Sequence, residues 1–248
     1  MKRPASLSEP RSPELVVIYD NNPYDNRLRT AHGFSCLVRL AQKSILFDTG
    51  GDSSTLLYNM KQLQIDPREV DTVVLSHIHG DHVGGLGGFL EQNNTAIVYL
   101  PQSFPRGFKE GVRVFGARVE EVRGTRELFT GVHTTGELGS NIIEQSLIII
   151  IGRGLAVITG CAHPGIIEII RRAKEVVPNQ IVSLVIGGFH LSGGSSVQIE
   201  SIISSFIQLG VERVSPCHCS GESARHLFQE SHGTNYIESG IGKRILFP

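Results

Sequence analysis

The sequence predicts an α+β fold in which two mixed β-sheets pack against each other and helices cover their outer faces. Three observations lead to this fold class. Short runs rich in β-branched and aromatic residues recur through the first part of the chain, with turn residues between them. In the last third, such runs alternate with amphipathic helical patterns. Histidines directly follow several of the predicted strands, so they should gather at one edge of the sheets.

The first half is expected to consist mainly of strands. The runs at 14–20, 34–41 and 44–50 are rich in β-branched and aromatic residues, and each ends in turn signals. A helix is expected over 54–64, because apolar residues recur there at helical spacing.

A short buried strand at 72–77 is expected to deliver a histidine-rich loop at its carboxyl end. Before it, Asp66 fits a helix N-cap and Pro67 fits the first helical position. The segment 96–151 is expected to be β-rich. A hairpin is expected around 152–154, where Gly-Arg-Gly separates two apolar runs.

Helices and strands alternate in the last third of the chain. Amphipathic helices are expected at 166–177 and at 199–210, the second of which ends at a glycine. Strands are expected at 183–188 and 213–218. No internal linker or repeat is evident. We therefore expect a flexible leader over residues 1–13 and a single domain over residues 14–248.

Composition excludes several classes of function. The chain has 248 residues, 40% of them hydrophobic, and a formal net charge of −1 without a long basic run, so we expect no nucleic-acid partner. It has no stretch of about 18 apolar residues, so we expect no membrane span. The N-terminus lacks the apolar stretch of a signal peptide, which favours the cytoplasm. The four cysteines are then expected to be reduced thiols.

The stretch SHIHGDHVGGL, residues 76–86, contains the clearest candidates for metal ligands. His77, His79, Asp81 and His82 are the side-chain types that bind zinc, iron and manganese. His77 and His79 are two positions apart and point the same way from an extended strand end, while Asp81 and His82 follow the turn. They can therefore face two metal ions about 3.5–4 Å apart, which share a hydroxide that attacks an ester, amide or phosphate.

This stretch resembles the signature motif of the metallo-β-lactamase superfamily, and FDTG at 47–50 resembles its strand-end aspartate motif. The resemblance covers nearly the whole chain from about residue 14. It implies an αβ/βα four-layer sandwich and a binuclear site of two divalent ions, Zn²⁺ first, with Mn²⁺ or Fe²⁺ as alternatives. It also implies that Asp48 orients the histidine loop and does not itself bind metal.

Further ligands are expected at strand ends on the same edge. The candidates are His133, His163, His190 and His218, and His163 is preferred over His133 because GCAHPG forms the tighter turn. Many superfamily members have a metal-bridging aspartate where this chain has Cys161. A thiolate could bridge there, or Cys161 could be a small buried residue beside the site.

These residues divide between two expected metal ions. One ion is assigned to His77, His79 and His163, and the other to Asp81, His82 and His218. Asp81 is also the expected base. His190 is expected to act in acid–base catalysis or in substrate binding, with ligation as the alternative. His226 and His232 are expected at the surface.

HGFS, TGCAHPG, GGFHL and PCHCSG together resemble a narrower subfamily, which includes an archaeal dihydropterin-ribofuranosylaminobenzene-phosphate synthase. That resemblance makes His32 and Asn21, with its neighbours Asp20 and Asn22, candidates for the pocket. The alternative for these residues is a turn closed by Asx-type hydrogen bonds.

The leading hypothesis is a metal-dependent hydrolase that acts on a small ester or phosphate-type substrate. The resemblance offers a second: a dihydropteroate-synthase-like transferase that joins a dihydropterin methyl diphosphate to an arylamine. A third, from another class, is a non-catalytic metal-binding or sensor module, which the loss of the bridging aspartate at Cys161 keeps open. A small-molecule substrate is expected in the first two cases. Apolar strands that would be exposed in a monomer could pair between two copies of the chain, so a homodimer is also expected as a possibility.

Overall fold

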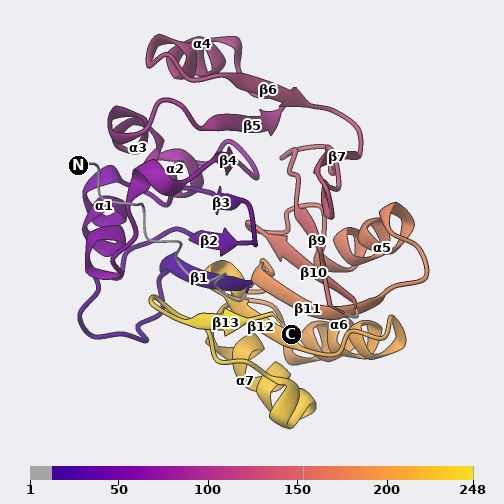
Figure 1. Cartoon of the computed structure of the whole chain (residues 1–248). Coiled ribbons are helices and arrows are strands. Elements are labelled where there is room, and N and C mark those ends of the chain that lie inside the picture. Colours follow the sequence, from indigo (N-terminus) through magenta and orange to yellow (C-terminus); the bar gives the residue numbers. More distant parts are fainter. Residues whose placement is uncertain (1–12, 153, 248) are drawn as a thin grey trace.

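The computed structural model describes residues 13–152 and 154–247. Apart from Pro13, the predicted leader lies outside the described residues. The described chain forms two mixed β-sheets that face each other, with helices on the outer side of each (Figure 1). The predicted fold class is therefore confirmed.

The first sheet has seven strands in the order β13-β1-β2-β3-β4-β5-β6. Neighbours from β13 to β3 pair antiparallel, and those from β3 to β6 pair parallel. The strands are β1 (Glu14–Tyr19), β2 (Ser35–Arg39), β3 (Ser44–Phe47), β4 (Thr72–Val74), β5 (Ile97–Pro101), β6 (Val119–Val122) and β13 (Arg244–Leu246).

The second sheet has six strands in the order β12-β11-β10-β9-β8-β7. The three strands from β12 to β10 are parallel, and the remaining neighbours are antiparallel. The strands are β7 (Arg126–Phe129), β8 (Val132–Thr134), β9 (Leu147–Ile151), β10 (Gly154–Thr159), β11 (Ile181–Gly188) and β12 (Val214–Cys217).

Alternation along the strands divides the apolar residues into three layers. In β1, Leu15 and Val17 face the core between the sheets, while Val16 and Ile18 face the helices outside the first sheet. Successive side chains of a strand point to opposite faces, so a fully apolar strand fills two layers at once. The third layer lies between the second sheet and its own helices.

The helices cover the outer faces as predicted. Helices α1 (Ser53–Gln62), α2 (Gly80–Val83), α3 (Leu86–Gln92) and α4 (Arg106–Val114) belong to the first half. Helices α5 (Ile166–Val176), α6 (Ser196–Gln208) and α7 (Glu222–His232) cover the second sheet. Three short 3₁₀ turns are η1 (Pro67–Glu69), η2 (His218–Ser220) and η3 (Gly233–Asn235).

The segment 96–151 contains a helix in addition to the predicted strands. Helix α4 buries a single residue, Val112, and its remaining residues are mostly polar and exposed. Phe104, Phe108 and Val112 recur at helical spacing and pack on the layer outside the first sheet, a pattern that the β-rich prediction for this segment overlooked. The edge strand β13 is also absent from the prediction. It is only three residues long, too short to give a strand pattern in the sequence, and it forms by pairing with β1.

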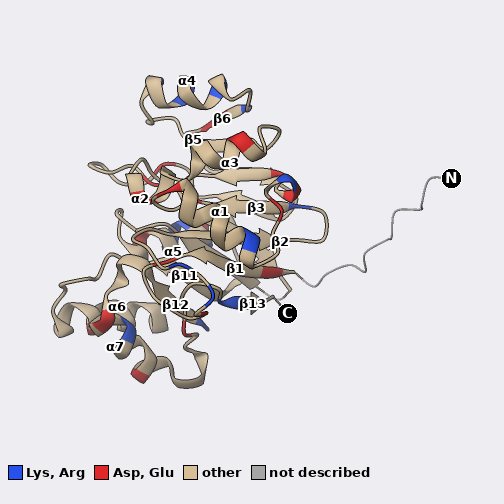
Figure 2. Cartoon of the chain, turned by 90° about the vertical axis from the view of Figure 1, so that its left-hand side faces the viewer, with Lys and Arg blue, Asp and Glu red and all other residues tan. Residues whose placement is uncertain are grey.

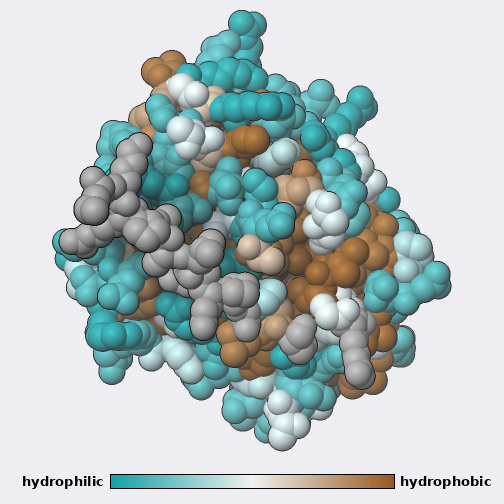
Figure 3. All heavy atoms as spheres, viewed as in Figure 1, coloured by the Kyte–Doolittle hydropathy of each residue, from teal (hydrophilic) through white to brown (hydrophobic). Residues whose placement is uncertain are grey.

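The surface shows no face dominated by one charge in the view of Figure 2, where acidic and basic residues are scattered over many elements. Apolar surface gathers on the right of Figure 3. Ile150 of β9 and Ile181 of β11 are each more than two-fifths exposed. None of the helices in the described part of the chain has the length and apolar character that crossing a bilayer requires.

The parallel strands determine where the candidate site lies. Strands β3 and β4 of the first sheet, and β10, β11 and β12 of the second, run parallel within their sheets. The carboxyl ends of parallel neighbours meet at one edge of a sheet, and loops that follow these ends carry the predicted site residues. Two facing sheets can therefore contribute ligands to one site.

A substitution at Gly84 tests how closely the backbone packs behind the histidine loop. A Cβ atom there would lie 2.1 Å from the carbonyl oxygen of Gly51, which is backbone and cannot rotate away. We expect Gly84→Ala to lower the free energy of unfolding by about 1–3 kcal/mol. Gly87→Ala is the matched control, because its Cβ would meet nothing closer than 3.7 Å. Urea unfolding of both variants makes the test, and equal stability would contradict this packing.

Candidate metal centre

The structure brings the predicted site residues together at the edge where the two sheets meet. Each follows or precedes a strand: Asn21 after β1, His32 before β2, Asp48 after β3, His77, His79, Asp81 and His82 after β4, Cys161 and His163 after β10, His190 after β11, and His218 after β12. Seven of these residues, together with Cys219, form three groups of possible ligands that share Cys161, and the ligand atoms within each group lie within 4.8 Å of one another. The three groups are Asp81, His82, Cys161 and His218; His77, Cys161 and His163; and Cys161, His190 and Cys219.

Asp48 lies beneath the histidine loop and is fully buried. Its Oδ1 accepts a hydrogen bond from the Ser76 backbone N–H at 2.7 Å, and its Oδ2 accepts from Ser76 Oγ at 2.7 Å. His82 Nδ1 lies 2.7 Å from the same Oδ2. Burial raises the pKa of Asp48 to about 8 against the lowering effect of the Ser76 donors, so a nearby cation would favour its ionised form.

These contacts set the tautomers of three histidines. His82 Nδ1 donates to Asp48, and His77 Nδ1 donates to Ser76 Oγ at 2.9 Å, because that hydroxyl already gives its proton to Asp48. His218 Nδ1 donates to Asn21 Oδ1 at 3.0 Å. Each ring then carries its lone pair on Nε2, the nitrogen that faces the interior of the site.

The first ligand group contains His77 and His163 with Cys161, and the His79 ring lies beside those two histidines although it is outside the group. His77 Nε2 lies 3.1 Å from His79 Nδ1, and the His163 ring centroid lies 4.8 Å from that of His77 and 4.9 Å from that of His79. His163 Nε2 is buried and has no hydrogen-bond partner among the described residues. A buried nitrogen without a partner costs stability unless something binds it, so this group fits a cation.

The second group is formed by Asp81, His82 and His218. His82 Nε2 lies 3.2 Å from His218 Nε2, although both Nδ1 atoms hold the ring protons. Asp81 Oδ2 lies 3.3 Å from His218 Nε2 and 3.6 Å from His82 Nε2. When His218 Nε2 carries no proton, lone pairs and a carboxylate converge here, an arrangement that a cation stabilises.

Cys161 lies between the two groups. Its Sγ is 3.2 Å from His82 Nε2, and it belongs both to the group of His77 and His163 and to the group of Asp81, His82 and His218. The residues present thus fit divalent metal: imidazoles and a carboxylate suit zinc, iron and manganese, and a thiolate favours zinc among these.

The imidazoles of His77, His82 and His163 are in the neutral state that metal binding requires. Burial lowers the pKa of His77 and of His82, and burial followed by the neighbouring His190 lowers that of His163 to about 4. These rings are therefore neutral at pH 7, and protons do not compete for their lone pairs. At His218, against the lowering effect of burial, the hydrogen bond to Asp81 raises the pKa, so a metal ion there competes with a proton.

Glu144 fixes the loop that carries Cys161 and His163. Its buried carboxylate accepts backbone N–H hydrogen bonds from Gly160, Cys161 and Ala162 at 3.0–3.1 Å and from His163 at 2.8 Å. Burial raises the pKa of Glu144, and these backbone donors oppose the rise. Glu144 is not among the site residues predicted from the sequence, because a glutamate far from every motif gives no local signal.

The backbone is strained where it delivers the site. Six non-glycine residues in the described chain have a positive φ, and four of them lie here: Asp48 at 55°, Ala162 at 59°, His190 at 54° and His218 at 48°. Such conformations cost about 1–3 kcal/mol each and persist where surrounding contacts hold them. Their concentration at this edge agrees with a functional site.

His32 and His190 lie at the rim. The His32 side chain is 72% exposed, and its Nε2 lies 3.2 Å from Asp81 Oδ2. The His190 ring is exposed and lies 4.5 Å from the His163 ring, centroid to centroid. Asn21 joins the rim to the site, since its Nδ2 lies 3.3 Å from His32 Nδ1.

The other histidines lie elsewhere. His133 is in β8, where it pairs with Ile148 and Glu127, and it belongs to none of the three ligand groups. His226 is exposed on α7 and faces Glu230 at 3.3 Å. His232, at the end of α7, is partly buried and stacks on Phe228, so its predicted place at the surface is wrong in part.

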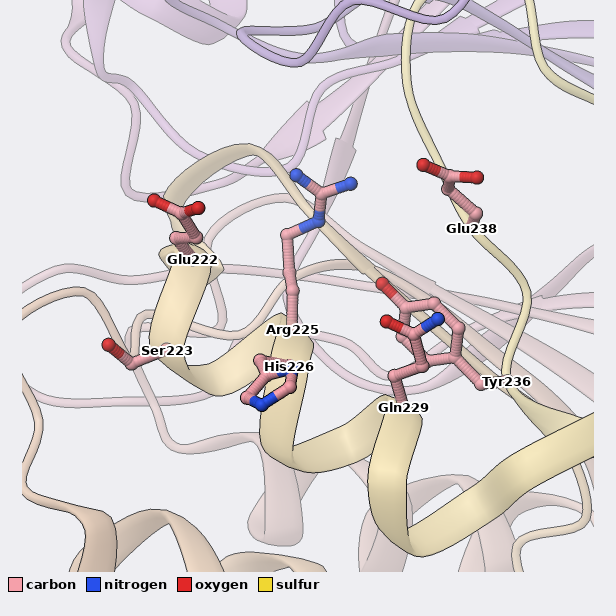
Figure 4. A pocket seen from close by; sticks show the side chains of 7 residues that line it. All are labelled: Glu222, Ser223, Arg225, His226, Gln229, Tyr236 and Glu238. Atoms are coloured by element: carbon pink, nitrogen blue, oxygen red, sulfur yellow. The ribbon is translucent and has the colours of Figure 1, made fainter.

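A separate pocket of about 430 Å³ opens beside α7 (Figure 4). Arg225 extends from the helix with Glu222 on one side and Glu238 on the other. Its Nη1 donates to Asn22 Oδ1 at 2.6 Å, and Asn22 donates to Asp20, whose Oδ1 accepts from the His218 backbone at 3.3 Å. Hydrogen bonds thus connect this pocket to a candidate ligand.

Comparison with known proteins agrees with this geometry. A model of the metallo-beta-lactamase superfamily matches residues 29–218. A curated relative from Methanocaldococcus jannaschii, 7,8-dihydropterin-6-methyl-4-(beta-D-ribofuranosyl)-aminobenzene-5'-phosphate synthase, is 29% identical over 90% of this chain and 92% of its own length.

Solved structures show the same architecture. A metal-dependent hydrolase of the beta-lactamase superfamily superposes with a TM-score of 0.79 and 28% identity, over 94% of this chain and 98% of that one. A ribonuclease Z from Nanoarchaeum equitans is more distant, with 26% identity over 59% of this chain and 52% of its own length.

Glu144 offers a test of how the ligand loop is held. Glu144→Gln replaces one acceptor oxygen by an NH₂ group that cannot accept the backbone N–H bonds. We expect affinity for Zn²⁺ to fall about 10- to 100-fold, measured by competition with a chromophoric chelator. Glu91→Gln, on an exposed face of α3, is the control and should leave the affinity unchanged. Equal affinity in the two variants would show that the carboxylate does not position the ligands.

Proposed function

This chain belongs to the metallo-beta-lactamase superfamily, and we propose that it is a metal-dependent hydrolase with a binuclear site for a small ester or phosphate-type substrate. The convergence of ligand atoms at one edge of the two sheets carries this proposal. His82 Nε2 and His218 Nε2 face each other at 3.2 Å beside Asp81, and His163 Nε2 is buried without a partner next to His77. We assign zinc to both positions, with manganese or iron as alternatives.

The two ligand sets divide as the sequence motifs suggest. His77, His79 and His163 hold one ion, and Asp81, His82 and His218 hold the other. When bound, two such ions supply a hydroxide at neutral pH and neutralise charge on the reacting carbonyl or phosphoryl group. Asp48 and Asn21 keep the ring protons on the far side of His82 and His218.

The chain's own residues move the protons. Asp81 accepts a proton from the attacking water, because its Oδ2 is partly exposed and lies between the ligand histidines and His32. Hydrogen bonding to His218, together with nearby charges, lowers the pKa of Asp81 despite its burial, so it is ionised at neutral pH. His190, exposed at the rim, donates a proton to the leaving group.

Cys161 takes the place of a bridging carboxylate in this proposal. Its Sγ is shared by both ligand groups, and its position is fixed by the Glu144 bond to its backbone N–H at 3.0 Å. As a thiolate, Cys161 would contribute one negative charge to the ligand set, as an aspartate would.

A second function is favoured by the Methanocaldococcus jannaschii synthase, since that relative matches 90% of the chain. In that case the same centre would activate the diphosphate of a dihydropterin methyl diphosphate, and an arylamine would displace it. The residues that hold the ions are the same in both cases, so the acceptor, water or amine, distinguishes the two reactions.

The ligand assignment makes a direct prediction about activity. His82→Ala removes an imidazole from the second group and leaves Asp48 without its histidine partner. We expect kcat/KM for hydrolysis of a phosphodiester or ester to fall at least about 100-fold. His226→Ala on exposed α7 is the matched control and should retain activity. A His82→Ala variant as active as the control would contradict the assignment.

The choice between hydrolase and transferase needs one assay under two conditions. Zinc-, manganese- and iron-loaded protein is offered generic phosphoesters and esters in water, and separately a dihydropterin methyl diphosphate with and without an arylamine. We expect turnover with water alone. Turnover that requires the amine would replace the hydrolase by the transferase. Metal binding with no turnover in any assay would favour a non-catalytic binding module.

A further inference from the structure

A third group of metal-binding side chains adjoins the two described above. Cys161 Sγ, a ring nitrogen of His190 and Cys219 Sγ all lie within 4.8 Å of one another. This group differs in chemistry from the other two, because it contains two thiols and each of the others contains one. His190 and Cys219 belong to neither of the other groups, and only Cys161 is shared.

The fold holds these three residues at neighbouring strand ends. Cys161 follows β10, His190 follows β11 and Cys219 lies in η2 after β12, and these three strands are parallel neighbours. Cys219 Sγ also contacts the Cys161 carbonyl oxygen at 3.6 Å. A Cβ on Gly188 would lie 2.6 Å from Cys219 Sγ, so the glycine provides the space that the sulfur occupies.

The group is open to solvent on one side. Cys161 is buried, Cys219 is partly buried and His190 is exposed, so the three donors lead from the interior of the site to the surface. In a tetrahedral zinc site, sulfur and nitrogen ligands lie roughly 3.4–3.8 Å apart, given bond lengths of about 2.0–2.3 Å. Small rotations of the side chains bring three donors within 4.8 Å to this spacing.

We propose that Cys161, His190 and Cys219 form a third cation site, which binds thiophilic divalent ions such as Cd²⁺ or Zn²⁺. Three protein ligands leave one coordination position for water, as in exchangeable zinc sites. Binding releases the Cys219 proton, and also the Cys161 proton where a neighbouring ion has not already displaced it. Mn²⁺ prefers oxygen and nitrogen ligands, so it does not fill this site.

The softness of the third site separates it experimentally from the histidine groups. Reduced full-length protein is first saturated with Mn²⁺ and then titrated with Cd²⁺, while bound metal is counted and thiolate-to-cadmium absorption is recorded in the ultraviolet. Cys219→Ala removes a ligand that belongs to neither histidine group. Cys36→Ala is the matched control, because Cys36 is buried between the sheets, away from every ligand group.

We expect wild-type protein and Cys36→Ala to bind one more Cd²⁺ per chain than Cys219→Ala, with stronger thiolate absorption than this variant, which keeps only the thiol of Cys161 in the group. His190→Ala provides a second variant should Cys219→Ala fail to fold, and it should weaken the same ion at least about 100-fold. Equal cadmium counts and equal absorption in wild type and Cys219→Ala would overturn the proposal. The difference in bound cadmium between wild type and Cys219→Ala can be measured whether or not the histidine groups hold metal. A negative result for the third site is therefore distinct from a negative result for the proposed function.

Discussion

The buried carboxylate of Asp48 is the contact on which the candidate site depends. It follows β3, accepts two hydrogen bonds from Ser76 after β4, and holds the Nδ1 proton of His82. Through the Ser76 hydroxyl it also determines which nitrogen of His77 is free. Asp48 thus orients one histidine in each of the two histidine groups. A carboxylate without charge compensation is costly at this depth, so the arrangement favours a cation above it.

In the second sheet, too, a buried carboxylate holds the ligand loop. Glu144 accepts backbone N–H bonds from the loop after β10, as Asp48 does from the loop after β4. Each sheet therefore fixes its own half of the site with a buried carboxylate, and neither half is complete alone. The group of His77 and His79 needs His163 from the second sheet. Asp81 and His82 likewise need His218, which explains why a two-sheet sandwich, and not one sheet, supports this chemistry.

Local patterns were enough to predict much of this arrangement. The histidine loop lies within one short stretch, and apolar runs followed by His163, His190 or His218 point to strand ends at a shared edge. The preference for His163 over His133 agrees with the geometry, since His133 lies within β8. Glu144 could not be predicted, because its role arises from packing between segments distant in sequence. Helix α4 was missed although Phe104, Phe108 and Val112 recur on one helix face, because the segment is short and lies between two strands.

The central claim is that two divalent ions occupy the two histidine groups, with Cys161 between them. Anomalous diffraction from crystals of protein loaded with two equivalents of zinc tests it most directly. The account predicts two peaks about 3.5–4 Å apart. One should be coordinated by His77, His79 and His163, and the other by Asp81, His82 and His218. A single peak in this region, or none, would contradict the binuclear centre.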